Sequence, residues 1–185
     1  MTLSPVYIGR PQETREPVEQ RVYDLLDALQ ISYQRVDHDP AYDMDACAGI
    51  SQALGVHICK NLLLTPRNRS AFYLLAMPED LPFRTADFSK IIGSSRLSFA
   101  TGEDLQALLG VQPGSASVLG LMNDTEGKVQ LLIDEDIMKD PYFGCHPCIN
   151  TSSLKIRTSD LIAKIIPALK HAPKMVKLPG AEKQQ

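Results

Sequence analysis

The sequence lacks the features of a membrane protein and of a disulfide-stabilised secreted protein. No apolar run approaches the roughly 18–20 residues that a membrane helix needs. Met1–Arg10 contains no basic segment followed by an apolar stretch, as a signal peptide would. Four cysteines in 185 residues are too few for a disulfide scaffold. These absences predict a cytoplasmic protein.

The common catalytic motifs are also missing. The sequence has no Walker loop, no glycine-rich dinucleotide fingerprint, no His-Glu-x-x-His pair and no Gly-x-Ser-x-Gly elbow. It therefore gives no support to nucleotide hydrolysis, hydride transfer, zincin proteolysis or serine-hydrolase chemistry. If the chain is an enzyme, its chemistry depends on backbone groups, a lysine or the substrate itself.

Basic residues are not in excess. Lys and Arg number 19 against 22 Asp and Glu, so the formal net charge is −3. This balance excludes a domain held to nucleic acid by bulk positive charge, but it allows a local basic patch. The candidates for such a patch are Lys60, Arg67, Arg69, Lys155 and Arg157.

Hydrophobic periodicity predicts helices and hairpins interspersed along one domain. Helices are expected near 18–29, 43–54, 83–92, 101–109 and 160–169, and strands near 31–36, 61–65, 71–77, 118–122, 129–133 and 154–157. Two hairpins are expected, 61–65 with 71–77 and 118–122 with 129–133. Without regular βαβ alternation, the pattern indicates an α+β fold: a single compact domain with a mixed or largely antiparallel sheet flanked by helices.

Several local features are predicted at the ends of these elements. In the first helix Val18, Val22 and Leu26 form a buried stripe, whereas Glu19 faces solvent. Thr158 or Ser159 is expected to cap the last helix, which Pro167 kinks or shortens. Residues 1–16 are predicted to be a loose arm, 17–170 the folded domain and 171–185 a frayed tail.

Three segments could carry chemistry. The first is the glycine-containing loop Gly110–Ser117, between a helix and an apolar run. Its Gly110 and Gly114 permit positive φ, Pro113 stiffens it and Ser115 adds a hydroxyl, so its backbone amides could face an oxyanion. An ordinary turn at a helix exit is the alternative.

The second segment is Lys60-Asn61 at the start of an apolar strand. A lysine in this place can contact a phosphate or a carbonyl group, and Asn61 offers both a donor and an acceptor. The alternative is a solvated lysine at a strand end.

The third segment is Gly144–Thr151, which contains Cys145, His146 and Cys148. The Cys-x-x-Cys pair could be a redox dithiol or half of a zinc site, but no second pair supplies the remaining ligands. His146, between glycine- and proline-containing turns, is better suited to present an imidazole to a ligand. A histidine hydrogen-bonded into a turn is the alternative.

Taken in order, these segments resemble the free-standing prolyl-tRNA editing proteins. The resemblance rests on the segments 60–64, 110–115, 123–124 and 146–151, and spans about residues 18–170. This superfamily includes the insertion domain of bacterial prolyl-tRNA synthetase and the YbaK deacylases. It implies a barrel-like mixed sheet and hydrolysis of the ester of mischarged tRNA(Pro), with alanyl-tRNA(Pro) as the expected substrate.

The resemblance also assigns roles to residues. It places Lys60, Gly114 and His146 in the catalytic site and implies substrate binding by Asn61, Gly110, Pro113, Ser115 and Asn150. It implies neither a metal nor a cofactor. The expected partner is the acceptor end of an aminoacyl-tRNA, with no DNA or membrane partner, and a role for prolyl-tRNA synthetase as a second partner stays open.

Some residues depart from the family pattern. Val118-Leu119 replaces a frequent Pro-Phe pair, His38-Asp39-Pro40 replaces a His-Pro pair, and Cys145 and Cys148 replace apolar residues. Two other functions therefore remain open. One is a binding module of the same fold that does not hydrolyse its ligand, and the other is a thiol-redox or zinc protein.

Overall fold

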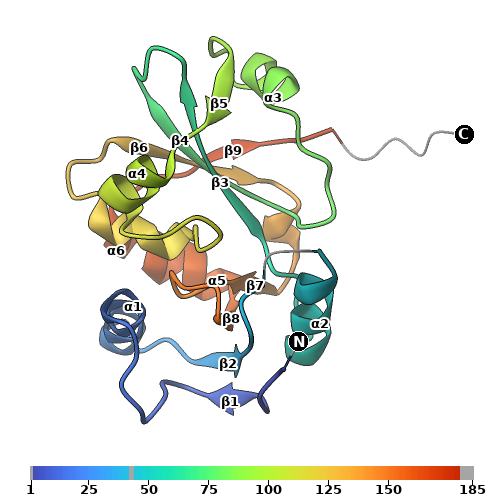
Figure 1. Ribbon diagram of the computed structural model, residues 1–185, viewed down its shortest axis with the longest axis vertical. Helices are drawn as coiled ribbons and strands as arrows, with labels where there is room; N and C mark the ends of the chain where they lie inside the picture. The colour runs from blue at the N-terminus through green and yellow to red at the C-terminus, as the bar shows by residue number, and fades with distance from the viewer. Residues whose placement is uncertain (1, 42–43, 180–185) are drawn as a thin grey trace, which may run out of the picture.

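The computed structural model describes residues 2–41 and 44–179, which form helices and two β-sheets (Figure 1). The α-helices are α1 (Pro17–Ala28), α2 (Met44–Leu54), α3 (Thr85–Ile91), α4 (Gly102–Asp104), α5 (Thr158–Asp160) and α6 (Ile166–Leu169). Two π-helical segments, η1 (Leu105–Leu109) and η4 (Leu161–Ile165), and two 3₁₀ segments, η2 (Val118–Asn123) and η3 (Ile137–Lys139), accompany them. The strands are β1 (Tyr7–Ile8), β2 (Tyr33–Asp37), β3 (Lys60–Pro66), β4 (Phe72–Met77), β5 (Leu97–Phe99), β6 (Val129–Asp134), β7 (Tyr142–Cys145), β8 (Ser152–Arg157) and β9 (Lys174–Val176).

The two sheets differ in their topology. An antiparallel sheet has the order β1-β2-β8-β7, and a mixed sheet has the order β5-β3-β4-β6-β9, in which β6 runs parallel to both of its neighbours. Figure 1 shows the helical segment from α5 to α6 between the sheets. The predicted α+β class is confirmed. Neither sheet closes on itself within the described residues, so the barrel-like part of the expectation is not observed.

The sheets meet where β3 begins. The Cys59 N–H donates to the Gly144 carbonyl oxygen at 2.9 Å, and Ile58 forms a parallel bridge with Gly144. The largest buried apolar cluster takes residues from both sheets, among them Leu74 of β4 and Leu154 of β8. Burial of this shared surface is the main force holding the sheets together.

Helix α1 follows its predicted pattern with one exception. Pro17 occupies its first turn, and Val22 and Leu26 are fully buried. Glu19, predicted to face solvent, is buried, and its Oε1 accepts a hydrogen bond from the Tyr23 hydroxyl at 2.6 Å. The exception arises because Tyr23, one turn later on the same face, is buried and its hydroxyl needs a partner.

One predicted hairpin is confirmed and the other is wrong. Strands β3 and β4 pair antiparallel as predicted. The apolar run expected as a strand over 118–122 is the 3₁₀ segment η2, and β6 pairs with β4 instead of with that run. The Ser117 hydroxyl oxygen accepts from the Leu119 N–H and starts the 3₁₀ turn. A short apolar run does not distinguish a strand from a buried helical turn, and this explains the error.

The chain ends are more ordered than predicted where the structure describes them. Strand β1 pairs with β2, and β9 adds a parallel strand beside β6, although both lie in segments expected to be loose. His171 is buried with its Nε2 2.9 Å from Asp124 Oδ2, which ties the chain to the turn before β6. Residues 180–185 of the predicted tail lie outside the described residues.

The predictions for the other helix ends are confirmed in part. Gly55 has φ +60° and closes α2 as expected, whereas Asp43, its predicted start, lies outside the described residues. Neither Thr158 nor Ser159 caps α5, which begins without a side-chain cap after Arg157. The π-helical turn η4 precedes Pro167, so the helix continues through this proline instead of ending there. No helix in the described part of the chain is long and apolar enough to span a bilayer.

Candidate active site

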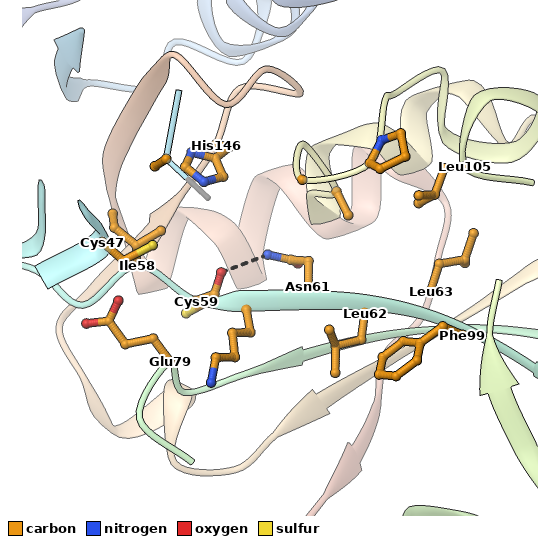
Figure 2. Close-up of a pocket in the computed structure, with 15 residues that line it drawn as sticks. Cys47, Ile58, Cys59, Asn61, Leu62, Leu63, Glu79, Phe99, Leu105 and His146 are labelled. Atoms are coloured by element: carbon orange, nitrogen blue, oxygen red, sulfur yellow. Dashed lines mark hydrogen bonds between the residues drawn. The ribbon is translucent and has the colours of Figure 1, made fainter. Parts of the chain in front are cut away.

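A cavity of about 410 Å³ lies beside β3, and it collects residues from distant parts of the sequence (Figure 2). Three of the predicted segments contribute to it. The lining residues are Ala41, Cys47, Ile58, Cys59, Lys60, Asn61, Leu62, Leu63, Glu79, Phe99, Leu105, Pro113, Gly114, Ala116 and His146. Most of these side chains are apolar. The few polar groups among them therefore determine how a ligand is oriented in the cavity.

The cavity opens at an uncovered edge of β3. Toward one end of this edge Cys59 pairs with Gly144, and toward the other end the Ala100 N–H donates to the Leu63 carbonyl oxygen at 2.8 Å. Residues two apart in a strand direct their backbone groups to the same edge, so the N–H and C=O of Asn61 face the gap between these contacts. The strand edge itself thus offers a donor and an acceptor to a ligand.

The side chain of Asn61 adds a further acceptor. Its Nδ2 donates to the Cys59 carbonyl oxygen at 3.1 Å, whereas its Oδ1 is buried with no hydrogen-bond partner in the described part of the chain. Figure 2 shows Asn61 and Leu63 on one face of β3 and Leu62, beside Phe99, on the other. A buried acceptor without a partner is unfavourable in the empty protein and is relieved by a ligand donor.

Lys60 lines the cavity at the start of β3. Its Nζ lies 3.4 Å from the Leu81 carbonyl oxygen, and no ion pair of Lys60 is found among residues 2–41 and 44–179. Its ammonium group is therefore available to an anionic or carbonyl group of a ligand.

The Gly110–Ser117 loop reaches the cavity through Pro113, Gly114 and Ala116. Gly114 has φ +87°, a conformation that favours glycine. The helix before the loop starts with a capping box between Thr101 and Asp104 and is anchored by an ion pair of Asp104 with Arg69. The loop is thus built on a well-anchored element.

Three predicted site residues do not line the cavity. Gly110 has φ +66° and ends η1, where a β-carbon would lie 2.9 Å from Asn123 Nδ2. Ser115 is buried, and its N–H donates to the Gln112 carbonyl oxygen at 3.0 Å. Asn150 is buried and its carbonyl oxygen accepts from the Ala41 N–H at 3.2 Å. Of the three, only Asn150 contacts a residue that lines the cavity, Ala41.

His146 is buried at the cavity wall. Its Nδ1 lies 3.0 Å from the Ser152 carbonyl oxygen and 3.1 Å from the Ser153 hydroxyl oxygen. Burial lowers the pKa of His146 to about 4, so the imidazole is neutral at physiological pH. His146 therefore lines the cavity, as its predicted role requires, and it is also hydrogen-bonded to the local chain, as the alternative interpretation stated.

Cys145 and Cys148 are free thiols inside the apolar core. Burial raises the pKa of the Cys148 thiol to about 12 and that of Cys145 well above its usual value. Reactive and metal-binding cysteines act as thiolates, which this environment disfavours. Within residues 2–41 and 44–179 no cluster of His, Cys, Asp and Glu is suited to hold a metal ion.

Glu79 and Phe99 line the cavity but carry no signal in the sequence. Glu79 Oε1 accepts from the Ser51 hydroxyl at 3.0 Å and lies 3.2 Å from His57 Nδ1. Phe99 is 59% exposed and packs against Phe83, with ring centroids 6.1 Å apart. Neither residue belongs to a motif, and only the folding of α2, β4 and β5 around β3 places them here.

Comparisons with known proteins identify the family of this chain. Residues 38–164 match the model of the aminoacyl-tRNA editing domain family. The chain is 29% identical over 160 residues to the prolyl-tRNA editing protein ProX of Acetoanaerobium sticklandii, covering 86% of this chain and 97% of that protein. It is 25% identical over 165 residues to prolyl-tRNA synthetase associated domain-containing protein 1 of Danio rerio, covering 88% and 86%.

Solved structures show the same fold. One is the crystal structure of a candidate trans-editing enzyme for prolyl tRNA synthetase, which superposes with a TM-score of 0.66 at 16% identity and covers 90% of this chain and 100% of that one. The family match includes Lys60, the Gly110–Ser117 loop and His146. The match confirms the family that the four sequence segments resembled. The chain belongs to the aminoacyl-tRNA editing domain family.

Proposed function

We propose that this protein is a trans-editing hydrolase that removes the amino acid from mischarged tRNA(Pro), with alanyl-tRNA(Pro) as its substrate. One observation carries the proposal: Lys60, Gly114 and His146, which are far apart in sequence, line a single cavity. The cavity is lined mostly by apolar side chains, which suits a site that admits the short apolar side chain of alanine. Size selection corrects a synthetase that cannot fully exclude a smaller amino acid.

Each of the three residues has a distinct task in this proposal. The unpaired ammonium group of Lys60 binds the phosphate or the ribose of the terminal nucleotide. Backbone N–H groups of the loop at Gly114 stabilise the negative charge that develops on the ester carbonyl oxygen. The neutral imidazole of His146 forms part of the wall around the amino-acid side chain.

The reaction needs no protein nucleophile in this scheme. Water attacks the ester carbonyl carbon, a ribose hydroxyl of the substrate assists, and the bond from this carbon to the ribose oxygen breaks. The products are the free amino acid and the tRNA. The Cys59 thiol also lines the cavity, but burial raises its pKa, so it is a poor nucleophile at neutral pH.

A deacylation panel tests the function. We expect the protein to release alanine from alanyl-tRNA(Pro) much faster than it releases amino acids from seryl-, cysteinyl- or prolyl-tRNA(Pro). Intact alanyl ester at high concentrations of folded protein would overturn the proposal. Retained binding of the tRNA in that case would identify a binding module of the same fold.

The contact with tRNA is proposed to be confined to the acceptor end. With 19 Lys and Arg against 22 Asp and Glu, the protein has no excess of positive charge with which to hold a large area of tRNA backbone. Each phosphate contact adds roughly 0.7–0.9 to the slope of log affinity against log salt concentration. A slope corresponding to only a few contacts is expected in a salt titration of tRNA binding, and a slope near 10 would contradict a small footprint.

A further inference from the structure

A serine hydroxyl connects two histidines beside the cavity. Ser153 Oγ lies 3.1 Å from His146 Nδ1 and 2.9 Å from His38 Nε2, and all three residues are buried. The His38 Nδ1 lies 2.8 Å from the Asp39 carbonyl oxygen. His38 comes from the segment after β2, His146 follows β7 and Ser153 lies on β8, so the fold brings three separate segments together.

The hydrogen bonds can run in only one direction. A carbonyl oxygen only accepts, so the Asp39 oxygen requires a proton on His38 Nδ1 and the Ser152 oxygen requires one on His146 Nδ1. Burial lowers the pKa of both imidazoles, so each ring is neutral and carries a single N–H. Ser153 therefore donates to His38 Nε2 and accepts from His146 Nδ1.

This direction leaves His146 Nε2 without a proton. Nε2 is the ring nitrogen turned away from β8, and it has no hydrogen-bond partner in the described part of the chain. Since His146 lines the cavity, the group offered there is an acceptor (Figure 2). Asn61 also lines this cavity, but its side-chain Oδ1, which has no hydrogen-bond partner in the described part of the chain, is buried. Glu79, the carboxylate of the lining, is already engaged by Ser51 and His57.

We propose that His38 and Ser153 are positioning residues that, together with the Ser152 carbonyl oxygen, hold His146 in its Nδ1–H form, so that Nε2 accepts a hydrogen bond from the α-amino group of the bound aminoacyl ester. The assignment of the ligand group rests on the proposed function, whereas the assignment of the proton rests on the hydrogen bonds and on the burial of the two rings. An ester-linked amino acid carries its donors on the α-amino nitrogen, which the neutral acceptor His146 Nε2 complements.

The first test reads the proton position directly. Two-bond ¹H–¹⁵N spectra of the histidine rings, recorded on the whole chain without substrate, are expected to show protonated Nδ1 and unprotonated Nε2 for His146. In Ser153→Ala only the Ser152 carbonyl oxygen still holds this proton, and in His38→Leu the Ser153 hydroxyl is free to donate to His146 Nδ1, so the fraction of the Nδ1–H form is expected to fall in both variants. His38→Gln, which keeps an acceptor for Ser153, is expected to preserve this form. A proton on Nε2 of wild-type His146 would overturn the inference.

The second test measures deacylation of alanyl-tRNA(Pro). Loss of a hydrogen bond to a charged group costs about 10- to 100-fold in equilibrium terms, and partial loss of the competent tautomer costs less. We therefore expect kcat/KM to fall severalfold, and by at most about 100-fold, in Ser153→Ala and His38→Leu, mainly through KM. His38→Gln is expected to stay within about threefold. Thermal melting of each variant accompanies the kinetics, because a structural role alone would lower stability without changing the tautomer.

The two tests separate the inference from the proposed function. Absence of turnover in a wild type whose His146 carries its proton on Nδ1 would overturn the proposed function and still support the proton assignment. An active wild type with unchanged His146 spectra and unchanged KM in folded Ser153→Ala and His38→Leu would overturn the inference and leave the function standing.

Discussion

A β-carbon on Gly144 would lie 2.4 Å from the carbonyl oxygen of His57, closer than real side chains come to a backbone atom. This approach occurs where β7 meets the segment leading into β3, next to the hydrogen bond from Cys59 to Gly144. The junction joins the two sheets and forms one end of the open edge of β3. Gly144 thus determines both the packing of the sheets and the shape of the cavity.

The variant Gly144→Ala is expected to destabilise the protein by about 2–3 kcal/mol, because the backbone of His57 must move. Denaturant unfolding measures the change. Gly127→Ala is the control for a glycine substitution without a clash: Gly127 has φ +65°, which Gly144 does not share, but no atom lies within 4 Å of its added β-carbon, so only about 1–2 kcal/mol of backbone strain is expected. Equal losses in the two variants would contradict the steric argument.

Lys60→Ala is expected to lower kcat/KM for alanyl-tRNA(Pro) by about 10- to 100-fold, because a charged hydrogen-bond donor to the substrate is lost. Steady-state deacylation measures this effect. Lys128→Ala removes an exposed lysine that pairs with Glu126 and does not line the cavity, so its activity should match that of the wild type. Similar rates for Lys60→Ala and the wild type would contradict a role of Lys60 in substrate binding.

Gly114→Ala is expected to reduce kcat at least tenfold while costing about 1–2 kcal/mol of stability. A φ of +87° is strained in alanine, so the loop shifts and its amides leave the ester carbonyl. Gly93→Ala carries the same kind of strain at φ +67° but does not line the cavity. A comparable loss of activity in Gly93→Ala would show that the effect comes from general destabilisation.

The buried imidazole of His146 should make stability depend on pH between about 6.5 and 4. Its pKa falls from 6.5 to about 4 on folding, so the folded state binds fewer protons than the unfolded state throughout this window. The contribution of neutral His146 to the free energy of unfolding is fully present above pH 6.5. As the pH falls to 4, the free energy of unfolding decreases by about 3 kcal/mol in total. Carboxylates with lowered pKa values, such as Asp104 and Asp124, titrate below this window.

Denaturant unfolding at a series of pH values, compared between the wild type and His146→Gln, isolates this term. The difference between the two proteins should shrink as the pH falls from 6.5 to 4. His38 is expected to contribute in the same direction in both proteins, because burial lowers its pKa as well. A constant difference would show that His146 titrates alike in the folded and unfolded states.

Replacement of Cys145 and Cys148 by alanine is expected to leave kcat/KM within about threefold, because both thiols are buried away from the cavity lining. The double variant should lose stability through lost packing. Slow reaction of these thiols with a thiol reagent in the native wild type, at the rate of unfolding, is the accompanying expectation. Deacylation that depends on the oxidation state of the pair would contradict a packing role.

The sequence by itself determined the elements whose burial pattern repeats along several turns or residues. The stripe of Val22 and Leu26 specified α1, and two apolar runs around a polar turn specified the β3–β4 hairpin. Gly110 and Gly114 correctly indicated backbone at positive φ. The net charge of −3 excluded a domain held to nucleic acid by bulk positive charge and left a local basic patch open.

Only the tertiary structure decided which elements meet. Periodicity reports that a face is buried but not what covers it, so the parallel pairing of β6 with β4 and the 3₁₀ turn over Val118–Asn123 were not foreseen. The same holds for Glu79 in the cavity and for the link from His146 through Ser153 to His38. These contacts join residues separated by long stretches of chain, and their geometry follows from the packing of two sheets, which no local pattern encodes.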